Sequence, residues 1–238
     1  MQEIEKVVWG FPLFKTYEEK ERFFKVLGLL VSHQITFEKA AELLKLDREK
    51  LAFLLDLLEI DYSFLDEEEA NLERRAVKKL LEELKSEDSL TTSPLIFLEK
   101  LKYLDKIFDI FSEVIIPKAV YEEIRAKNDE SSKKIAELVN MGKIKVLQVN
   151  AKGIVGLHKG EAEAITLAKR SNCWVVLDDL KARKVARSEG VKVIGTLGIL
   201  KLLKELNLAE FEPEDLFKEL TQVGFRIKRE LFFEIFKD

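Results

Sequence analysis

The alternation of strand-like and helix-like segments after residue 112 constrains the fold of this chain more than any other feature. Short apolar runs such as IKVLQV and WVVLD alternate with amphipathic segments such as GEAEAITLAKR and KARKVARSEG. Short apolar runs between helices are typical of strands that are buried on both faces. The pattern therefore predicts an α/β fold in which helices flank a parallel sheet. Before it, residues 96–111 are amphipathic and are predicted to form one helix.

Acidic residues stand at two junctions between the predicted elements. Glu161 lies at the start of the helix that opens at Gly160, and Asp178 and Asp179 follow the apolar run at 173–177. Thr196 follows the next predicted strand. Ligands of parallel α/β sheets collect at the carboxyl ends of the strands, and carboxylates bind divalent cations. We therefore expect these residues to face one cleft that can bind metal.

A third acid comes from the segment AVYEEIRAK. At about 100° per residue, Glu123 lies nearer the edge of the apolar stripe of this helix than Glu122, which points away. Glu123 is therefore the better candidate for the cleft. The alternative is that both glutamates belong to a solvated helix face.

Composition narrows the class of protein. With 238 residues and 47% hydrophobic residues, the chain can bury a real core. No apolar run approaches about 20 residues and the first residues lack a signal-peptide pattern, so we expect a cytoplasmic protein without a membrane segment. The single cysteine, Cys173, excludes disulfides and cysteine-based zinc sites within the chain. The 35% of charged residues, mostly Lys and Glu, suggests a thermophilic source.

The small polar residues of KSEDSLTTS, at 85–93, indicate a boundary between two domains. We expect an all-helical domain at 1–88 and the α/β domain, with a C-terminal helical tail, at 89–238. The chain up to Leu90 carries 14 basic and 21 acidic residues, and the remainder carries 26 and 23. Opposite net charges favour contact between the two domains. The aromatic residues of the tail FRIKRELFFEIF indicate a docking or dimer surface, so a homodimer is expected.

The N-terminal domain has the spacing of a helix-turn-helix. A helical stripe runs from 17 to 32, and Thr36 and Asp47 are placed to cap two further helices. Arg48 and Lys50 would suit the start of a DNA-reading helix, but the acids that follow would not. A helical module that packs or dimerises is therefore the favoured interpretation, and specific DNA binding is the alternative.

Residues 20–75 resemble a family of small prokaryotic antitoxin-like proteins. The resemblance is carried by VSHQITFEKAAELLKLDREKLAFLLDLLEIDYSFLDEEEA, with its KAAELxxL helix, second helix and acidic tail. Membership would imply a role in masking a partner or in binding an operator.

The motifs of the second domain resemble the PIN-domain family. TTSPLIFLEKL, IIPKAVYEEI, GLHKGEAEAITLA, VVLDDLKARKVA and VKVIGTLGIL occur in the order found in its VapC-like toxin branch, over residues 89–205. The resemblance implies parallel strands and an acidic ribonuclease centre that depends on Mg²⁺ or Mn²⁺, as in the toxins of toxin-antitoxin pairs.

The resemblance also assigns the site. Glu123, Glu161 and Asp178 match catalytic, metal-binding acids, with Asp179 as a supporting ligand. Small hydroxyl positions that line the site fall at Ser93 and Thr196. The family's first aspartate, which precedes TSPLI, is replaced by Thr91. A hydroxyl adds no negative charge, so weaker metal binding and slower catalysis are expected.

Basic residues near these acids could guide RNA to the cleft, although they could equally be ordinary surface charges. The RNA-binding candidates are Lys181, Arg183 and Lys184. Three hypotheses remain. The chain is a metal-dependent PIN-type ribonuclease held in check by its own antitoxin-like domain, a degenerate PIN protein that regulates or binds nucleic acid, or a DNA-binding regulator.

Overall fold

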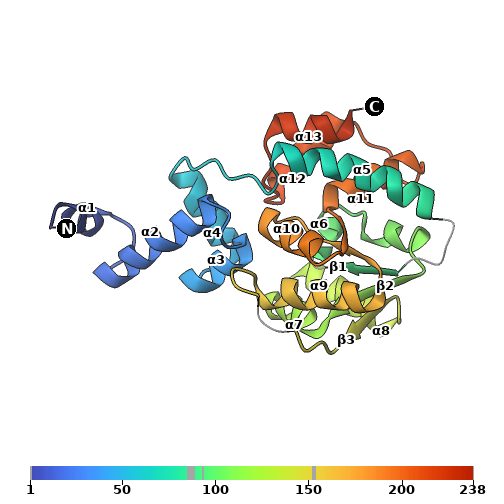
Figure 1. Cartoon of the computed structure of the whole chain (residues 1–238), viewed down its shortest axis with the longest axis horizontal. Coiled ribbons are helices and arrows are strands. Elements are labelled where there is room, and N and C mark those ends of the chain that lie inside the picture. The colour runs from blue at the N-terminus through green and yellow to red at the C-terminus, as the bar shows by residue number, and fades with distance from the viewer. Residues whose placement is uncertain (1, 85–88, 93, 152–153, 238) are drawn as a thin grey trace.

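The computed structural model describes residues 2–84, 89–92, 94–151 and 154–237. Helices precede the sheet, and strands and helices then alternate (Figure 1). The first helices are α1 (Gln2–Gly10), α2 (Tyr17–Val31), α3 (Phe37–Leu44), α4 (Arg48–Leu57) and α5 (Glu67–Glu83). The strands are β1 (Ser89–Thr92), β2 (Glu113–Pro117), β3 (Ile144–Leu147), β4 (Trp174–Val176) and β5 (Lys192–Ile194). The remaining helices are α6 (Leu95–Lys100), the 3₁₀ helix η1 (Leu104–Asp109), α7 (Lys118–Lys127), α8 (Glu130–Asn140), α9 (Lys159–Ser171), α10 (Leu180–Ser188), α11 (Thr196–Glu205), α12 (Pro213–Gln222) and α13 (Arg229–Phe236).

The described strands form one parallel sheet in the order β3-β2-β1-β4-β5. This confirms the predicted α/β fold. In the register of the central strand β1, Thr91 pairs with Ile115 of β2 and with Val175 of β4. The chain runs outward from β1 through β2 to β3 and then returns to β4, so the winding reverses between β1 and β4. Parallel sheets bind ligands at the carboxyl ends of the strands that flank such a reversal.

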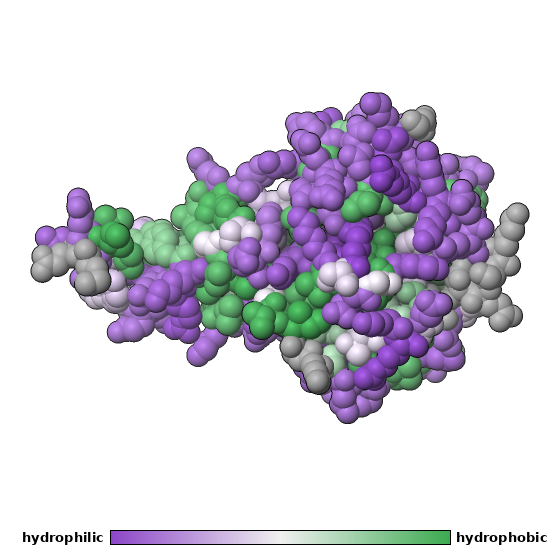
Figure 2. All heavy atoms as spheres, in the orientation of Figure 1, coloured by the Kyte–Doolittle hydropathy of each residue, from purple (hydrophilic) through white to green (hydrophobic). Residues whose placement is uncertain are grey.

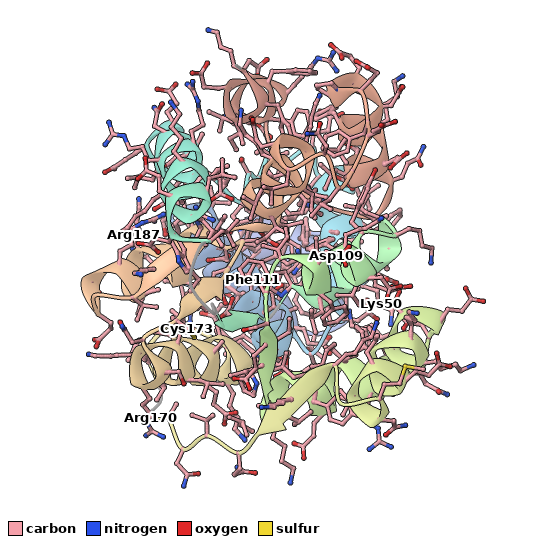
Figure 3. The ribbon with its side chains drawn as sticks, turned by 90° about the vertical axis from the view of Figure 1, so that its right-hand side faces the viewer. Lys50, Asp109, Phe111, Arg170, Cys173 and Arg187 are labelled. Atoms are coloured by element: carbon pink, nitrogen blue, oxygen red, sulfur yellow. The ribbon has the colours of Figure 1, made fainter. Side chains whose placement is uncertain are left out.

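Helices cover both faces of the sheet, as predicted (Figure 3). On one face, Val175 packs with Ile165 of α9 and Ala182 of α10. On the other, its strand neighbours Trp174 and Val176 belong to the larger core, to which α5, α6, α8, α11 and α13 contribute. This alternation follows from the two-residue period of a strand. It explains why the strand segments are apolar at consecutive positions.

The prediction of one helix at 96–111 is wrong in one respect, because the structure has two shorter helices there, α6 and η1. Lys102 has a left-handed backbone with φ 64°, and the chain continues as the 3₁₀ helix η1. Leu104 and Ile107, three residues apart, are both fully buried in the larger core. The three-residue spacing fits a 3₁₀ helix, in which positions i and i+3 lie one above the other. The break therefore keeps both side chains against the core.

The helix α5 packs on α11 and α13, beside the sheet (Figure 1). Its Glu73 is fully buried, and one carboxylate oxygen accepts from the backbone N–H groups of Gly195 and Gly198, both at 2.7 Å. The other oxygen accepts from Arg183 of α10. Glu73 therefore satisfies backbone donors at the start of α11 that have no partner within that helix. The division of the chain into two domains at residue 88 stays a prediction. The helix α5 precedes that boundary in the sequence but is anchored to the α/β part.

The first four helices lie to one side of the sheet, and α1 and α2 extend away from it (Figure 1). Thr36 and Asp47 are the N-caps of α3 and α4, as predicted. Several large apolar side chains of α1 and α2 are exposed, among them Ile4, Val7 and Trp9, and apolar surface is visible over these helices (Figure 2). None of the helices among the described residues is both long and apolar enough to cross a membrane.

The C-terminal tail docks within the chain. Phe225, Phe232 and Phe236 are buried in the larger core, and α13 contacts α5 and α11. The aromatic stripe that was predicted as a docking or dimer surface therefore packs, at these three positions, into the core of the same chain. A homodimer stays a prediction.

Candidate active site

The site lies at the carboxyl end of β4, where Asp178 and Asp179 follow the strand. Asp178 accepts two hydrogen bonds from Thr196, from the backbone N–H and from the hydroxyl, each at 2.7 Å. Asp179 is the N-cap of α10 and accepts from the N–H groups of Lys181 at 2.8 Å and Ala182 at 3.4 Å. Burial raises the pKa of Asp178 to about 6, although the hydrogen bonds from Thr196 lower it. Burial also raises the pKa of Asp179.

Glu161 reaches the same place from the first turn of α9. Its Oε2 accepts from the N–H of His158 and from the hydroxyl of Thr36, both at 2.9 Å. The side chain is buried, and burial, followed by the charge of Asp179, raises the pKa of Glu161 to about 8. Two buried carboxyl groups that repel one another in this way favour a bound proton or cation.

Glu123 lies on α7 beside the start of α9. A Cβ at Gly160 would come within 2.9 Å of Val120 and 3.1 Å of Glu123, so glycine allows these helices to approach. Glu123 lies 3.2 Å from Nδ1 of His158, whose Nε2 is 3.5 Å from Glu42 of α3. The hydrogen bond to Glu123 raises the pKa of His158. Glu122 pairs instead with Lys118 at the surface.

The N-terminal helices donate directly to these acids, which the sequence patterns did not indicate. We call residues 17–65, which include α2, α3 and α4, the lid. Besides the bond from Thr36 to Glu161, the N–H of Phe37 donates to Oδ2 of Asp179 at 3.0 Å, and the hydroxyl of Tyr62 is 3.3 Å from the same oxygen. Thr36 is also an N-cap, and that role gave the sequence signal for it. The bonds to the acids join residues more than a hundred positions apart.

Arg48, at the start of α4, lies over three phenylalanine rings and pairs with Glu38. Its guanidinium carbon is 5.1 Å from the ring centre of Phe37, 4.9 Å from Phe64 and 4.8 Å from Phe97. Burial lowers the pKa of Arg48 to about 10, and the charges of Asp178, Asp179 and Glu161 oppose this shift. The residue expected at the start of a DNA-reading helix therefore faces the acidic site. Lys50 is exposed and pairs with Asp47.

A cavity of about 400 Å³ lies between the lid and the α/β part. The lining includes all four predicted acids, namely Glu123, Glu161, Asp178 and Asp179. Arg48, Lys100, Lys127 and His158 also line it, together with apolar side chains from both parts of the chain. The structure thus brings the predicted acids together in one cavity, and Thr196 supports Asp178 from behind.

These oxygens are of the type that Mg²⁺ and Mn²⁺ prefer. Within the part of the chain that the structure describes, no group of three or more His, Cys, Asp or Glu side chains is placed to hold a metal. The acids point instead to protein donors, and the lid supplies several of these. In this arrangement the lid occupies lone pairs of Glu161 and Asp179.

One of the predicted hydroxyl positions, Thr91, lies on β1. Thr91 is part of the strand, and its backbone pairs with Val175, three residues before Asp178. Ser93 lies outside the described residues.

The predicted RNA-binding residues of α10 have different surroundings. Arg183 is fully buried: its guanidinium donates to Glu69 at 2.7 Å, to Glu73 and to the carbonyl of Leu177. It holds α5 to the end of β4 and has no exposed surface for RNA to bind. Lys184 is half exposed and pairs with Asp66 at 3.1 Å. Lys181 lies in a separate surface pocket beside Lys184 and His33.

The family model DUF3368, a PIN domain, matches residues 90–238, which is more than half of the chain. The chain belongs to the PIN-domain family. PIN domains are generally nucleases that depend on divalent metal ions. The match begins after α5, so neither the lid nor α5 lies within it. No curated protein matches the chain.

Proposed function

We propose that this PIN-domain protein is a metal-dependent ribonuclease of the toxin-antitoxin type whose lid acts as a fused antitoxin. The observation that carries the proposal is the set of hydrogen bonds from Thr36, Phe37 and Tyr62 of the lid to Glu161 and Asp179. These donors satisfy the carboxylates that the family resemblance assigns to the metal. The lid therefore acts as a competitor of the ion.

Glu123, Glu161 and Asp178 are proposed to supply the anionic oxygens for Mg²⁺ or Mn²⁺, with Asp179 in support. A divalent ion bound by such oxygens would supply Lewis-acid chemistry for hydrolysis of a phosphodiester. Thr196 positions Asp178 through two hydrogen bonds. His158 links Glu123 to Glu42 of the lid, so displacement of the lid would change the surroundings of a third acid.

A second candidate function is that of a degenerate PIN protein, which regulates or binds nucleic acid without cleaving it. Thr91, at the position of the family's first aspartate, favours this candidate. A site with one carboxylate fewer would bind a divalent cation more weakly.

The two candidates are separated by a cleavage assay on single-stranded RNA with Mn²⁺ or Mg²⁺, using the full chain. Two variants are compared with the wild type. Thr91→Asp restores the family's acid, and Glu161→Gln removes a proposed ligand without changing the size of the side chain. Metal-dependent cleavage by the wild type that Glu161→Gln abolishes supports the ribonuclease. Cleavage that appears only in Thr91→Asp supports degeneration. Cleavage unaffected by Glu161→Gln contradicts the assigned site.

A further inference from the structure

The first two helices pack on each other and form an arm that extends away from the sheet (Figure 1). We call residues 2–31, which include α1 and α2, the arm. The rings of Phe11 and Phe23 stack with their centres 5.5 Å apart. The buried Lys20 donates from Nζ to the carbonyl of Trp9 at 2.6 Å, close to the end of α1, where a cation is favourable. The arm is therefore one packed unit.

This unit leaves an apolar stripe exposed. On α1, Ile4 and Val7 are 71% and 69% exposed, and on α2, Phe24 and Val31 are 37% and 48% exposed. Residues three or seven positions apart lie on one face of a helix. The ring of Phe11, four residues after Val7, is 4.8 Å from the ring of Phe24 and connects the two halves of the stripe. Contiguous apolar surface of this kind marks an interaction site on a folded protein.

The charges beside the stripe favour a second copy of this chain as the partner. Glu21 lies one turn before Phe24 on the same side of α2, and it pairs with Lys25 at 3.0 Å, although both side chains are largely exposed. In a two-fold symmetric pair, residue i contacts residue j and j contacts i. If two copies of α2 pair antiparallel about an axis halfway between these residues, Glu21 of each copy lies opposite Lys25 of the other. The helix is thus complementary in charge to itself.

The shape of the chain permits this pairing. The α/β part lies beyond the C-terminal end of α2, and the other end of α2 points away from it (Figure 1). In an antiparallel pair of arms, the two α/β parts therefore lie at opposite ends and do not collide.

The size of the stripe also fits. Its exposed apolar side chains amount to roughly 400 Å² in each copy, if a fully exposed side chain of this size has about 150–250 Å². An interface of standard size buries about 800 Å² per partner, of which a little over half is apolar. The stripe and the polar residues along it therefore supply the area that a stable dimer needs.

We propose that the arm is a dimer interface, in which the apolar stripe packs antiparallel against the same stripe of a second copy. Apolar burial supplies the affinity, and the pairs between Glu21 and Lys25 set the orientation. Because α2 belongs to the lid as well as to the arm, the dimer joins two chains through their lids. The inference goes beyond the proposed ribonuclease and does not depend on it.

The first test is sedimentation velocity of the full chain over a range of concentrations. The wild type is expected to dimerise, and Ile4→Glu should weaken dimerisation by about tenfold or more, because it places a charge within the apolar contact. Met141→Glu is the matched control, because Met141 is also 71% exposed but lies at the end of α8 in the α/β part. Circular dichroism verifies that each variant keeps its fold.

The second test separates contact between copies from the pair within one helix. Glu21→Lys and Lys25→Glu each place like charges opposite one another in their own dimers, so both should dimerise more weakly than the wild type. In an equimolar mixture, opposite charges face each other again, and the mixed dimer should be tighter than either variant alone by about fivefold or more. Both variants lack the pair within the helix, so recovery in the mixture reports the contact between copies.

Loss of the dimer in Ile4→Glu but not in Met141→Glu, with recovery in the mixture, supports the proposal. Equal effects of Ile4→Glu and Met141→Glu overturn it, and so does a mixed dimer no tighter than those of the single variants. A wild type that stays monomeric at high micromolar concentration also overturns it. Cosedimentation of that monomer with anionic lipid vesicles would assign the stripe to a membrane surface instead.

Discussion

Gly156→Ala should loosen the lid, because Gly156, in the loop before α9, contacts the backbone of the lid. Its φ is +86°, and an added Cβ would lie 2.4 Å from the carbonyl oxygen of Gln34. Both contacting atoms belong to or adjoin the backbone, so neither can move aside as a flexible side chain would. The lid and the loop must move apart, and the bond from the N–H of Thr36 to the carbonyl of Gly156, 2.9 Å long, would be strained or lost.

The magnitude follows from two contributions. A left-handed alanine costs about 1–2 kcal/mol, and a lost hydrogen bond costs about 0.5–1.5 kcal/mol. Gly142→Ala isolates the first contribution, because Gly142 has φ +74° and no atom within 4 Å of an added Cβ. The difference between the variants, about 1 kcal/mol or more, raises the population of the open lid by about fivefold.

The assay is amide hydrogen exchange measured by mass spectrometry on peptides from α3 and α4, with α11 as an internal reference. Gly156→Ala should exchange about fivefold faster or more in the lid peptides, and Gly142→Ala should leave them unchanged. Equal exchange of the lid peptides in both variants would refute the argument that this contact holds the lid closed.

Two further predictions concern buried carboxyl groups. In metal-free buffer, the folded protein keeps a proton on Glu161 that the unfolded chain releases, since its pKa is raised from 4.5 to about 8. The free energy of unfolding should therefore fall as the pH rises between these values, by at most about 3 kcal/mol from pH 5 to 7. Glu161→Gln should flatten this dependence and be more stable than wild type at pH 8 in urea titrations, and parallel pH curves would contradict the assignment. Glu73→Gln should lower the free energy of unfolding by about 3–5 kcal/mol in the same titrations, because it breaks a fully buried ion pair with Arg183. The exposed Glu82→Gln on the same helix should change stability by less than about 0.5 kcal/mol, and similar losses in both variants would show that Glu73 does not anchor α5.

The sheet could be predicted because its information is local. Apolar runs between amphipathic segments fix the order of strands and helices, and Asp178 follows β4 in the sequence as it does in space. The N-caps Thr36 and Asp47 were predictable for the same reason, since a cap acts within its own first turn. The break at Lys102 was missed because the core, and not local propensity, sets the spacing of Leu104 and Ile107.

The opposite net charges of the two domains favoured a contact between them, but the individual bonds of the lid could not be predicted from patterns, because their partners are remote in the chain. The N–H of Phe37 carries no side-chain signal, yet it donates to Asp179, 142 residues away. Arg48 has the sequence position of a surface residue at a helix start, and only the fold places three phenylalanine rings around it. Glu73 and Arg183 likewise resemble solvated helix charges until α5 and α10 meet.

The most direct test of the blocked ribonuclease site is metal-dependent RNA cleavage in a series built on Thr91→Asp, measured with the full chain and Mn²⁺. Thr91→Asp alone should cleave slowly, because the lid still bonds to Glu161 and Asp179. Adding Gly156→Ala should raise the rate by about fivefold or more, in line with the opening of the lid. Adding Glu161→Gln to that pair should abolish cleavage. A rate unchanged by Gly156→Ala, or cleavage that survives Glu161→Gln, would contradict the account.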